Sequence, residues 1–428
     1  MLRLALHWQI LIALMLAVVA GMITGTDMAL FGVSFFAMYN FIGTLFLNAL
    51  KMIIVPLVVS SIIVGVAGIG GGQGLGRMGS KTVLYYMATS LLAILTGLLF
   101  VNLLAPGVVD GVPLQSIIGL DTGAAATASA QVAGRGLSDI ADVFLGMVPP
   151  NIIAAAANGQ MLGLIFFSLV FGFFMTRINE AYAESQYNFW QGIFETMMNI
   201  TDWVMKFAPL GVFALVAKVI AGMQGEDLGA LVTSLGSFFM TVVLALAVHM
   251  LITMPLLLRY IGRVQPLRHF RAMSPALLTA FSTSSSSATL PLTMECVEKN
   301  AKVSNRTSSF VLPLGATVNM DGTALYECVA AMFIAQAYGI ELSLTTQFLV
   351  VTIALLTSIG VAGIPAASLV AIAIILGAIG LPLEAIGLIL AVDRILDMCR
   401  TTVNVFSDSC GAVIIARTEG EEGLLPAR

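Results

Sequence analysis

Six long apolar runs constrain this chain more than any other feature. They lie near residues 8–26, 38–68, 80–105, 150–176, 188–220 and 229–258. Each is long enough to cross the roughly 30 Å hydrocarbon core of a bilayer, where a helix satisfies its own backbone polar groups. Only 10% of the residues are charged, whereas soluble domains carry about 25%. The sequence therefore predicts an all-α polytopic membrane protein.

The basic residues predict the orientation of these spans. If the N-terminus is cytoplasmic, thirteen Lys and Arg residues lie inside, four lie within spans, and only Arg135 and Lys218 lie outside. Cytoplasmic loops usually carry such an excess of positive charge. We therefore expect both termini in the cytoplasm and the protein in the cell (inner) membrane. No signal-peptide cleavage site follows the first run, so we expect that run to remain as a span.

Two later apolar segments are each broken in the middle. The first lies between the basic clusters 259–271 and 299–306 and is interrupted at Thr283–Thr289. The second, 344–381, is interrupted at Ser358–Pro365. Each half is too short to cross, and irregular backbone at membrane depth is tolerated only where protein or a water-filled cavity satisfies it. We therefore expect two re-entrant helical hairpins, the first entered from inside and the second from outside.

The two hairpin tips resemble each other. Their sequences, TSSSSATLP and TSIGVAGIP, have Thr, Ser, Ala and Pro at the same places. A span with a polar centre follows each tip: 307–338, broken at Asn319–Thr323, and 385–416. Two such units entered from opposite faces form the inverted repeat that builds many secondary-transporter sites at the bilayer midplane.

The last span carries a polar stripe on an otherwise apolar helix. Its six members fall within an arc of roughly 100°: Asp393, Asp397, Arg400, Thr401, Asn404 and Asp408. Charges inside a membrane are costly and usually mark a substrate or ion path. A buried structural ion pair is the alternative interpretation.

These residues suggest a substrate of mixed charge. Arg400 can hold a carboxylate through two parallel hydrogen bonds, and Asp397, on the same face, can take an ammonium. The Ser-rich tip offers hydroxyls and helix N-termini that suit a carboxylate. Asn319 and Asp321 offer oxygen ligands where a helix unwinds, which suits Na⁺. A substrate with an ammonium and more than one carboxylate would satisfy all of these groups.

Four motifs in order, TSSSSATLP, NMDGTALYE, SIGVAGIP and DMCRTTVNVFSDS, resemble the dicarboxylate/amino acid:cation symporter family. That family includes the excitatory amino-acid transporters and prokaryotic aspartate and glutamate homologues. The resemblance implies eight transmembrane helices plus two re-entrant hairpins, a homotrimer and an elevator-type transporter. It implies these parts: scaffold helices 1–2 in 1–78, transport-domain helix 3 in 79–105, an external linker in 106–148, scaffold helices 4–5 in 149–222 and the rest of the transport domain in 223–428.

The resemblance also implies site residues. The substrate contacts are Ser285, Ser286, Thr323, Ile364, Asp397, Arg400, Thr401 and Asn404. One sodium site uses Asn404, Asp408 and the carbonyls of Gly315 and Asn319. Another uses carbonyls of Thr317, Ser358 and Val361 near Met320, and a third uses Tyr86, Thr89, Ser90, Asn319 and Asp321. Glu327 matches a proton-linked carboxylate of the animal transporters.

One departure from the family pattern concerns an arginine. Members usually carry an additional Arg where this chain has Ser284 or Met398, and Arg394, one turn before Asp397, is a candidate substitute. Met320 favours sodium coupling, because the proton-coupled bacterial branch has Leu at this place.

The leading hypothesis is a sodium-coupled importer of aspartate or glutamate. Alternatives within the family are a proton- or sodium-coupled transporter of C4-dicarboxylates or of neutral amino acids. An ion channel would leave the Asp397 and Arg400 pair unexplained, and no motif of a membrane enzyme is present. We expect the lipid bilayer, Na⁺ and a small acidic amino acid as partners, with no cofactor and no nucleic acid. No Cys or His spacing predicts a disulfide framework or another metal site.

Overall fold

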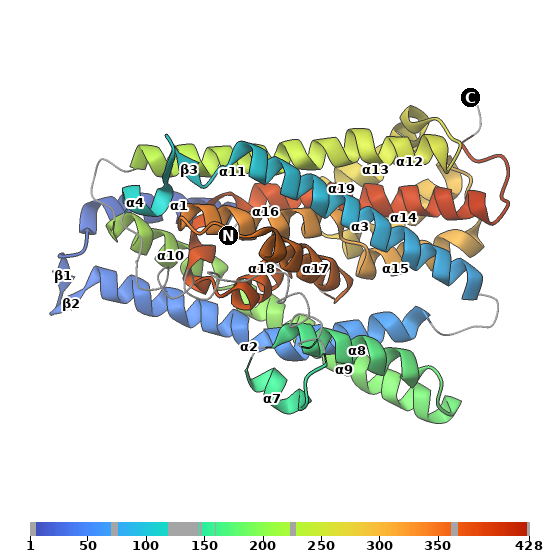
Figure 1. The fold of residues 1–428 in the computed structure, drawn as a ribbon, viewed down its shortest axis with the longest axis horizontal. Helices are drawn as coiled ribbons and strands as arrows, with labels where there is room; N and C mark the ends of the chain where they lie inside the picture. The colour runs from blue at the N-terminus through green and yellow to red at the C-terminus, as the bar shows by residue number, and fades with distance from the viewer. Residues whose placement is uncertain are drawn as a thin grey trace, which may run out of the picture.

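The computed structural model describes residues 6–69, 76–118, 145, 148–158, 160–222, 228–360 and 367–425. The described chain is almost entirely helical, and its helices run side by side along the long axis of the molecule (Figure 1). The first half contains α1 (Leu6–Thr24), α2 (Phe35–Ile69), α3 (Gly76–Leu104), α4 (Leu114–Ile118), α7 (Ile152–Ala157), α8 (Met161–Met175), α9 (Glu180–Met205) and α10 (Ala208–Gly222).

The second half contains helices that are interrupted at several points. They are α11 (Leu228–Val248), a π-helical turn η1 (His249–Thr253), α12 (Met254–Tyr260), α13 (Pro266–Thr283), α14 (Ser286–Glu295), a second π-helical turn η2 (Cys296–Asn300), α15 (Asn305–Val318), α16 (Asp321–Ala337), α17 (Leu344–Gly360), α18 (Ala367–Ile379), a 3₁₀ turn η3 (Leu383–Ala385) and α19 (Ile386–Thr418).

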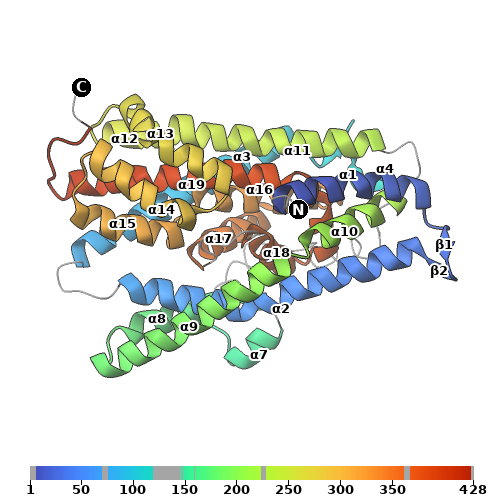
Figure 2. The same ribbon diagram turned by 180° about the vertical axis from the view of Figure 1, so that it is seen from behind.

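The helices fall into two packed groups. In the first helix group, α2 packs against α8, α9 and α10, and α1 packs along α10. In the second helix group, α3, α11, α13, α15 and α16 pack around α19 and one another, and α17 and α18 pack on α16. Figures 1 and 2 show α2, α8 and α9 along one side of the molecule and α11, α13 and α19 along the other. The two groups meet mainly where α10 contacts α19 and where α2 contacts α17.

Three of the described helices are long and apolar enough to cross a membrane, and a bent pair can be counted as a fourth. The three are Phe35–Ala67, Arg77–Leu104 and Gly229–Tyr260. The bent pair is α9 with α10, which meet at 55°, so the predicted run 188–220 is two helices instead of one straight span. The expected count of eight spans stays a prediction, because other segments are short, broken or, like α19, interrupted by charges.

The first broken segment is a pair of helices joined by a tight turn, as predicted. α13 ends at Thr283, Ser284 adopts a left-handed conformation (φ 51°), and α14 begins at Ser286. The hydroxyl of Ser285 accepts a hydrogen bond from the N–H of Ala288 at 3.2 Å and so caps α14. The two helices pack against each other (Figure 2). The second broken segment consists of α17 and α18, and its tip, 361–366, lies outside the described residues.

The first part of the expected linker, residues 106–118, contains a short ribbon and a helix. Val108–Val109 (β3) pairs antiparallel with Val112–Pro113 (β4), and α4 continues directly from them. α4 packs on α11 and α16, and its ends are buried. A second short ribbon, Ala29–Leu30 (β1) with Val33–Ser34 (β2), joins α1 to α2. Most of the remaining linker lies outside the described residues.

The chain beyond α19 turns back onto the start of α15. The carboxylate of Glu421 accepts hydrogen bonds from the N–H and hydroxyl of Ser304 at 2.8 and 2.6 Å, and from the hydroxyl of Thr307 at 2.5 Å. The N–H of Leu425 donates to the carbonyl of Ala301 at 2.9 Å. This C-terminal segment, residues 419–425, therefore binds Ser304, the N-cap residue of α15, and the hydroxyl of Thr307 in its first turn.

Candidate functional site

The break between α15 and α16 lies directly against the middle of α19. A Cβ atom at Gly322 would lie 2.7 Å from the carbonyl oxygen of Arg400, so only glycine allows the two backbones to approach this closely. The N–H of Gly322 donates to Oδ1 of Asn404 at 2.8 Å, and Nδ2 of Asn404 donates to the hydroxyl of Thr323 at 3.1 Å. Asn404 thus ties the first turn of α16 to α19.

A four-residue charge cluster surrounds the guanidinium of Arg400 on α19. Nη1 of Arg400 donates to Oδ1 of Asp393 at 3.1 Å, and Nη2 donates to Oδ1 of Asp397 at 2.9 Å. Nη1 of Arg394 donates to Oδ2 of Asp397 at 3.2 Å. Cζ of Arg400 lies 3.9 Å from the ring centroid of Tyr326 in α16, a cation–π distance. Two acidic and two basic side chains therefore balance each other in this cluster.

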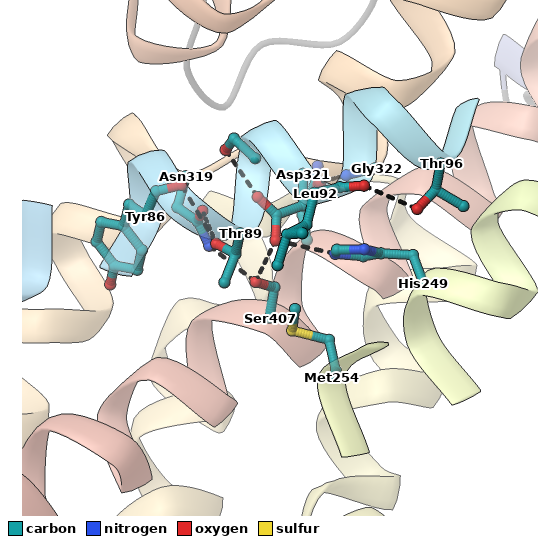
Figure 3. Close-up of polar contacts among 12 residues, drawn as sticks. Tyr86, Thr89, Leu92, Thr96, His249, Met254, Asn319, Asp321, Gly322 and Ser407 are labelled. Atoms are coloured by element: carbon teal, nitrogen blue, oxygen red, sulfur yellow. Dashed lines mark hydrogen bonds and ion pairs between the residues drawn. The ribbon is translucent and has the colours of Figure 1, made fainter. Parts of the chain in front are cut away.

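A second polar cluster is built around the buried carboxylate of Asp321 (Figure 3). Oδ1 accepts a hydrogen bond from Ser90 of α3 at 2.7 Å, and Oδ2 accepts one from Ser407 of α19 at 2.6 Å. Nε2 of His249, in η1, lies 3.2 Å from Oδ2. Two other helices, α3 and α19, and the turn η1 thus converge on the start of α16.

Asn319 connects Asp321 to the neighbouring carboxylate of Asp408. Its Nδ2 donates to Oδ1 of Asp408 at 2.8 Å and to the hydroxyl of Ser407 at 3.2 Å, and its Oδ1 lies 3.4 Å from the hydroxyl of Thr89. Among the residues that the structure describes, no Lys or Arg forms an ion pair with Asp321 or Asp408. Two buried carboxylates without a guanidinium or ammonium form a site that favours small cations.

Tyr86 and Gly315 complete this oxygen-lined region. A Cβ atom at Gly315 would lie 2.5 Å from Oδ1 of Asp408 and 2.6 Å from the hydroxyl of Tyr86, so a larger residue would collide with both. The hydroxyl of Tyr86 donates to the carbonyl of Val311 at 2.7 Å. Carboxylate, amide, hydroxyl and carbonyl oxygens are the ligands that hard cations prefer, so the residues present fit Na⁺.

The structure assembles most of the site residues expected from the sequence. It brings together Tyr86, Thr89, Ser90, Gly315, Asn319, Met320, Asp321, Thr323, Arg400, Asn404 and Asp408, all of which are buried. Ser285 and Ser286 lie at the tip of the first hairpin, and Thr401 is buried on α19. The hydroxyl of Ser358 bonds within α17, to the carbonyl of Leu355 at 2.7 Å. Thr317 lies in α15, while Val361 and Ile364 lie outside the described residues.

Glu327 is completely buried on α16, one turn beyond Thr323. Its Oε2 accepts a hydrogen bond from the hydroxyl of Thr357 in α17 at 2.9 Å, and its Oε1 has no hydrogen-bond partner among the residues that the structure describes. Thr357 directly precedes Ser358 at the end of the described part of α17. Glu327 therefore connects α16 to the helix that leads into the second hairpin tip.

Four contact residues were absent from the expected site. Asp393 was part of the polar stripe, and its offset of seven residues from Arg400 is two helical turns, so this contact had a signal. Ser407 and Tyr326 neighbour expected residues but lack a charge that would single them out. His249 lies in an apolar run. A histidine inside a membrane span usually has a polar partner, so its position could have suggested a contact with a carboxylate such as Asp321.

The fold and site define a class: a helical membrane protein that holds opposite charges and oxygen ligands in its interior. Comparison with known proteins gives the family. A family model described as the sodium:dicarboxylate symporter family matches residues 6–418, and the chain belongs to this family.

Several relatives match over most of their length. The proton/sodium-glutamate symport protein of Geobacillus stearothermophilus is 35% identical over 420 residues, covering 98% of this chain and 96% of the relative. The proton/glutamate-aspartate symporter of Escherichia coli (strain K12) is also 35% identical, covering 97% and 93%. The neutral amino acid transporter B(0) of Homo sapiens is 38% identical over 403 residues, covering 88% and 73%. The family resemblance expected from the motifs is confirmed.

Proposed function

We propose that this protein is a sodium-coupled secondary active symporter that imports aspartate or glutamate. The observation that carries the proposal is the charge cluster on α19, in which the fully buried Arg400 lies between Asp393 and Asp397. Arg400 would bind the side-chain carboxylate of the substrate and Asp397 its ammonium. Family membership and two bacterial relatives named as glutamate symporters support this assignment. Because the chain is also 38% identical to a neutral amino-acid transporter, the uptake experiment below includes a neutral amino acid.

Sodium would occupy the oxygen-lined region between α3, α15, α16 and α19. Asp321 would hold one ion with Ser90 and Thr89, and Asp408 would hold another with Asn404 and backbone carbonyls of Gly315 and Asn319. The absence of a Lys or Arg partner for either carboxylate among the described residues supports these assignments. A further set, Thr317, Ser358 and Val361 near Met320, is proposed from the family resemblance alone. Bound sodium would supply the positive charge that these carboxylates need, and the ion gradient would then drive uptake.

We further propose an elevator mechanism in a homotrimer with eight spans and two re-entrant hairpins. The first helix group would form the scaffold and the second would form the moving transport domain. The separate packing of the two groups around α2 and α19 supports this division. The termini would lie in the cytoplasm and the protein in the cell membrane. A native mass measurement on the purified protein tests the trimer, and a mass of one or two chains would contradict it.

Uptake into proteoliposomes tests the proposed function directly. Labelled aspartate, glutamate, serine and succinate are each offered under an imposed sodium gradient, and then under an imposed proton gradient. We expect aspartate and glutamate to accumulate with the sodium gradient. Accumulation of serine or succinate alone would select one of the other substrate classes, and uptake driven by protons alone would reject sodium coupling.

Glu327 is the proposed site of any proton that travels with the substrate. Its burial and its unpartnered oxygen support this role. Replacement of Glu327 with Gln keeps the size of the side chain and removes its ability to carry a charge. If uptake by the native protein responds to an imposed proton gradient, we expect Glu327→Gln to lose that response and keep its sodium dependence. Thr357→Val, which removes only the neighbouring hydroxyl, is the control, and an unaltered proton response in Glu327→Gln would rule out this assignment.

A further inference from the structure

Asp397 shares its carboxylate between two guanidiniums of different exposure. Arg400 contacts Oδ1 at 2.9 Å and Arg394 contacts Oδ2 at 3.2 Å. The side chain of Arg394 is 23% exposed, whereas that of Arg400 is 1% exposed. In this structure each oxygen of Asp397 therefore already accepts a hydrogen bond from a guanidinium, and an ammonium group at Asp397 must compete with these two positive charges.

Arg394 is the guanidinium that can leave. Arg400 is held by Asp393 at 3.1 Å and by the ring of Tyr326 at 3.9 Å, and it is buried on all sides. For Arg394, the contact with Asp397 is its single ion pair among the described residues, and its Nε has no hydrogen-bond partner. Because Arg394 is partly exposed and Arg400 is fully buried, Arg394 can move away from Asp397 while Arg400 stays in place.

We propose that Arg394 is a specificity-determining residue that exchanges with the ammonium of the substrate at Asp397. When an amino acid binds, its ammonium takes the place of Arg394. When a dicarboxylate without an amino group binds, Arg394 stays on Asp397 and neutralises it. Arg394 thereby sets how strongly the site prefers amino acids to plain dicarboxylates. The inference deepens the proposed function and rests on the roles given there to Asp397 and Arg400.

Loss of Arg394 has opposite consequences for the two ligands. Aspartate brings an ammonium that still pairs with Asp397, so its pairing there is unchanged. Succinate has no such group, and without Arg394 its carboxylates face an acidic residue neutralised only by the shared Arg400. Because like charges at close range repel, succinate binding must weaken more than aspartate binding. A purely structural role for Arg394 would weaken both ligands by the same factor.

Equilibrium binding tests this inference on the purified full-length protein in nanodiscs with saturating sodium. Labelled aspartate gives one dissociation constant, and competition by succinate gives the other. We expect Arg394→Ala to raise the preference for aspartate over succinate by about fivefold or more, the effect of one half-buried ion pair. Arg394→Lys keeps the positive charge and should retain the native ratio. Arg177→Ala, which removes an arginine that lies over Phe173 in the first helix group, should leave the ratio unchanged.

Several results would overturn the inference. If the ratio in Arg394→Ala stays within twofold of the native value, Arg394 does not set the preference. The same conclusion follows if the native protein binds aspartate but succinate never competes. Arg394→Gln, which keeps a polar side chain without the charge, replaces Arg394→Ala if the alanine protein does not fold. A native protein that binds neither ligand would overturn the proposed function itself, which separates the two failures.

Discussion

Arg400 is fully buried, and its Nε is left without a hydrogen-bond partner among the described residues. Asp393 and Asp397 take two of its nitrogens, and the ring of Tyr326 covers its face. The backbone of Gly322 lies next to that of Arg400. A Cβ atom at Gly322 would lie only 3.1 Å from Cα of Arg400. A guanidinium held in this way meets a carboxylate with its geometry already set, so little conformational entropy is lost on binding.

We expect Arg400→Ala to lower the affinity for aspartate by at least about 100-fold. Truncation of one partner of a buried charge pair typically costs 2–5 kcal/mol, and here it removes the proposed carboxylate ligand and exposes Asp393 and Asp397 to each other. Binding of labelled aspartate measures the loss. Arg400→Lys retains the charge but lacks the planar donor pair, so its affinity should fall between the two. Native affinity in Arg400→Ala would contradict the proposed role.

Asp408 should control the response to sodium without controlling the fold. Asp408→Asn removes the negative charge while an amide oxygen can still accept the hydrogen bond from Asn319. We expect the sodium concentration for half-maximal aspartate binding to rise by about tenfold, since one full charge of a cation site is lost. Asp27→Asn, at an exposed loop position, is the matched control. An unchanged sodium response in Asp408→Asn would remove this residue from the sodium site.

Residues that share a helix face were predictable from the sequence, and residues that meet across helices were not. The offsets in the polar stripe placed Arg400, Asn404 and Asp408 on one side of α19, and the structure has them buried there. The contact between His249 and Asp321 joins positions 72 apart, and it depends on how α11 and η1 pack against α16. No periodicity within a single segment carries that information. Val361 and Ile364 stay predictions, because they lie outside the described residues.

At the scale of elements, the breaks in the helices follow from local chemistry. Ser284, Asn319 and Gly322 lie where apolar periodicity stops, and the structure places a turn or an unwound step at each break. The short ribbon inside the expected linker could have been predicted from one dipeptide. Asp110 and Gly111 both have positive φ, 51° and 79°, and Asp-Gly between short apolar pairs is a strong hairpin signal.

The C-terminal segment should contribute measurable stability through Glu421. Burial works to raise the pKa of Glu421, but hydrogen bonds from Ser304 and Thr307 outweigh burial and hold that pKa below its usual 4.5. A carboxyl whose pKa is lower in the folded state stabilises the fold above pH 4.5, and this contribution is lost as the pH falls through the lowered value. We therefore expect Glu421→Gln to lower the free energy of unfolding by about 1 kcal/mol at neutral pH.

Thermal unfolding at several pH values checks this prediction. The difference between the native protein and Glu421→Gln should be present at pH 7 and should shrink below pH 4.5. Glu422→Gln changes the neighbouring exposed carboxylate and should match the native protein at every pH. A Glu421→Gln protein that unfolds with native stability at pH 7 would mean that the C-terminal segment does not hold the start of α15.

At the scale of the whole molecule, the contact between α10 and α19 should decide whether the two helix groups can move relative to each other. A Cβ atom at Gly387 of α19 would lie 3.6 Å from Cβ of Leu215 in α10. This distance falls within the range of about 3.5–4.5 Å that a disulfide requires. The pair therefore offers a reversible bridge between the proposed scaffold and the proposed transport domain.

We expect the double variant Leu215→Cys/Gly387→Cys to lose uptake when it is oxidised and to regain uptake when it is reduced. Sodium-dependent aspartate binding should survive oxidation, because neither position lies in the charge cluster or the oxygen-lined region. Each single variant, treated with the same oxidant, is the control for the four native cysteines. Full uptake by a completely bridged protein would refute the elevator mechanism.

The close crossing at Gly322 limits how this protein can diversify. Main-chain atoms of α19 fill the space that any side chain at residue 322 would need. Only glycine fits there, and the distance between α16 and α19 is therefore fixed at this point. A change of substrate preference during evolution must therefore come from substitutions around this crossing, at positions such as Arg394, while Gly322 itself is retained.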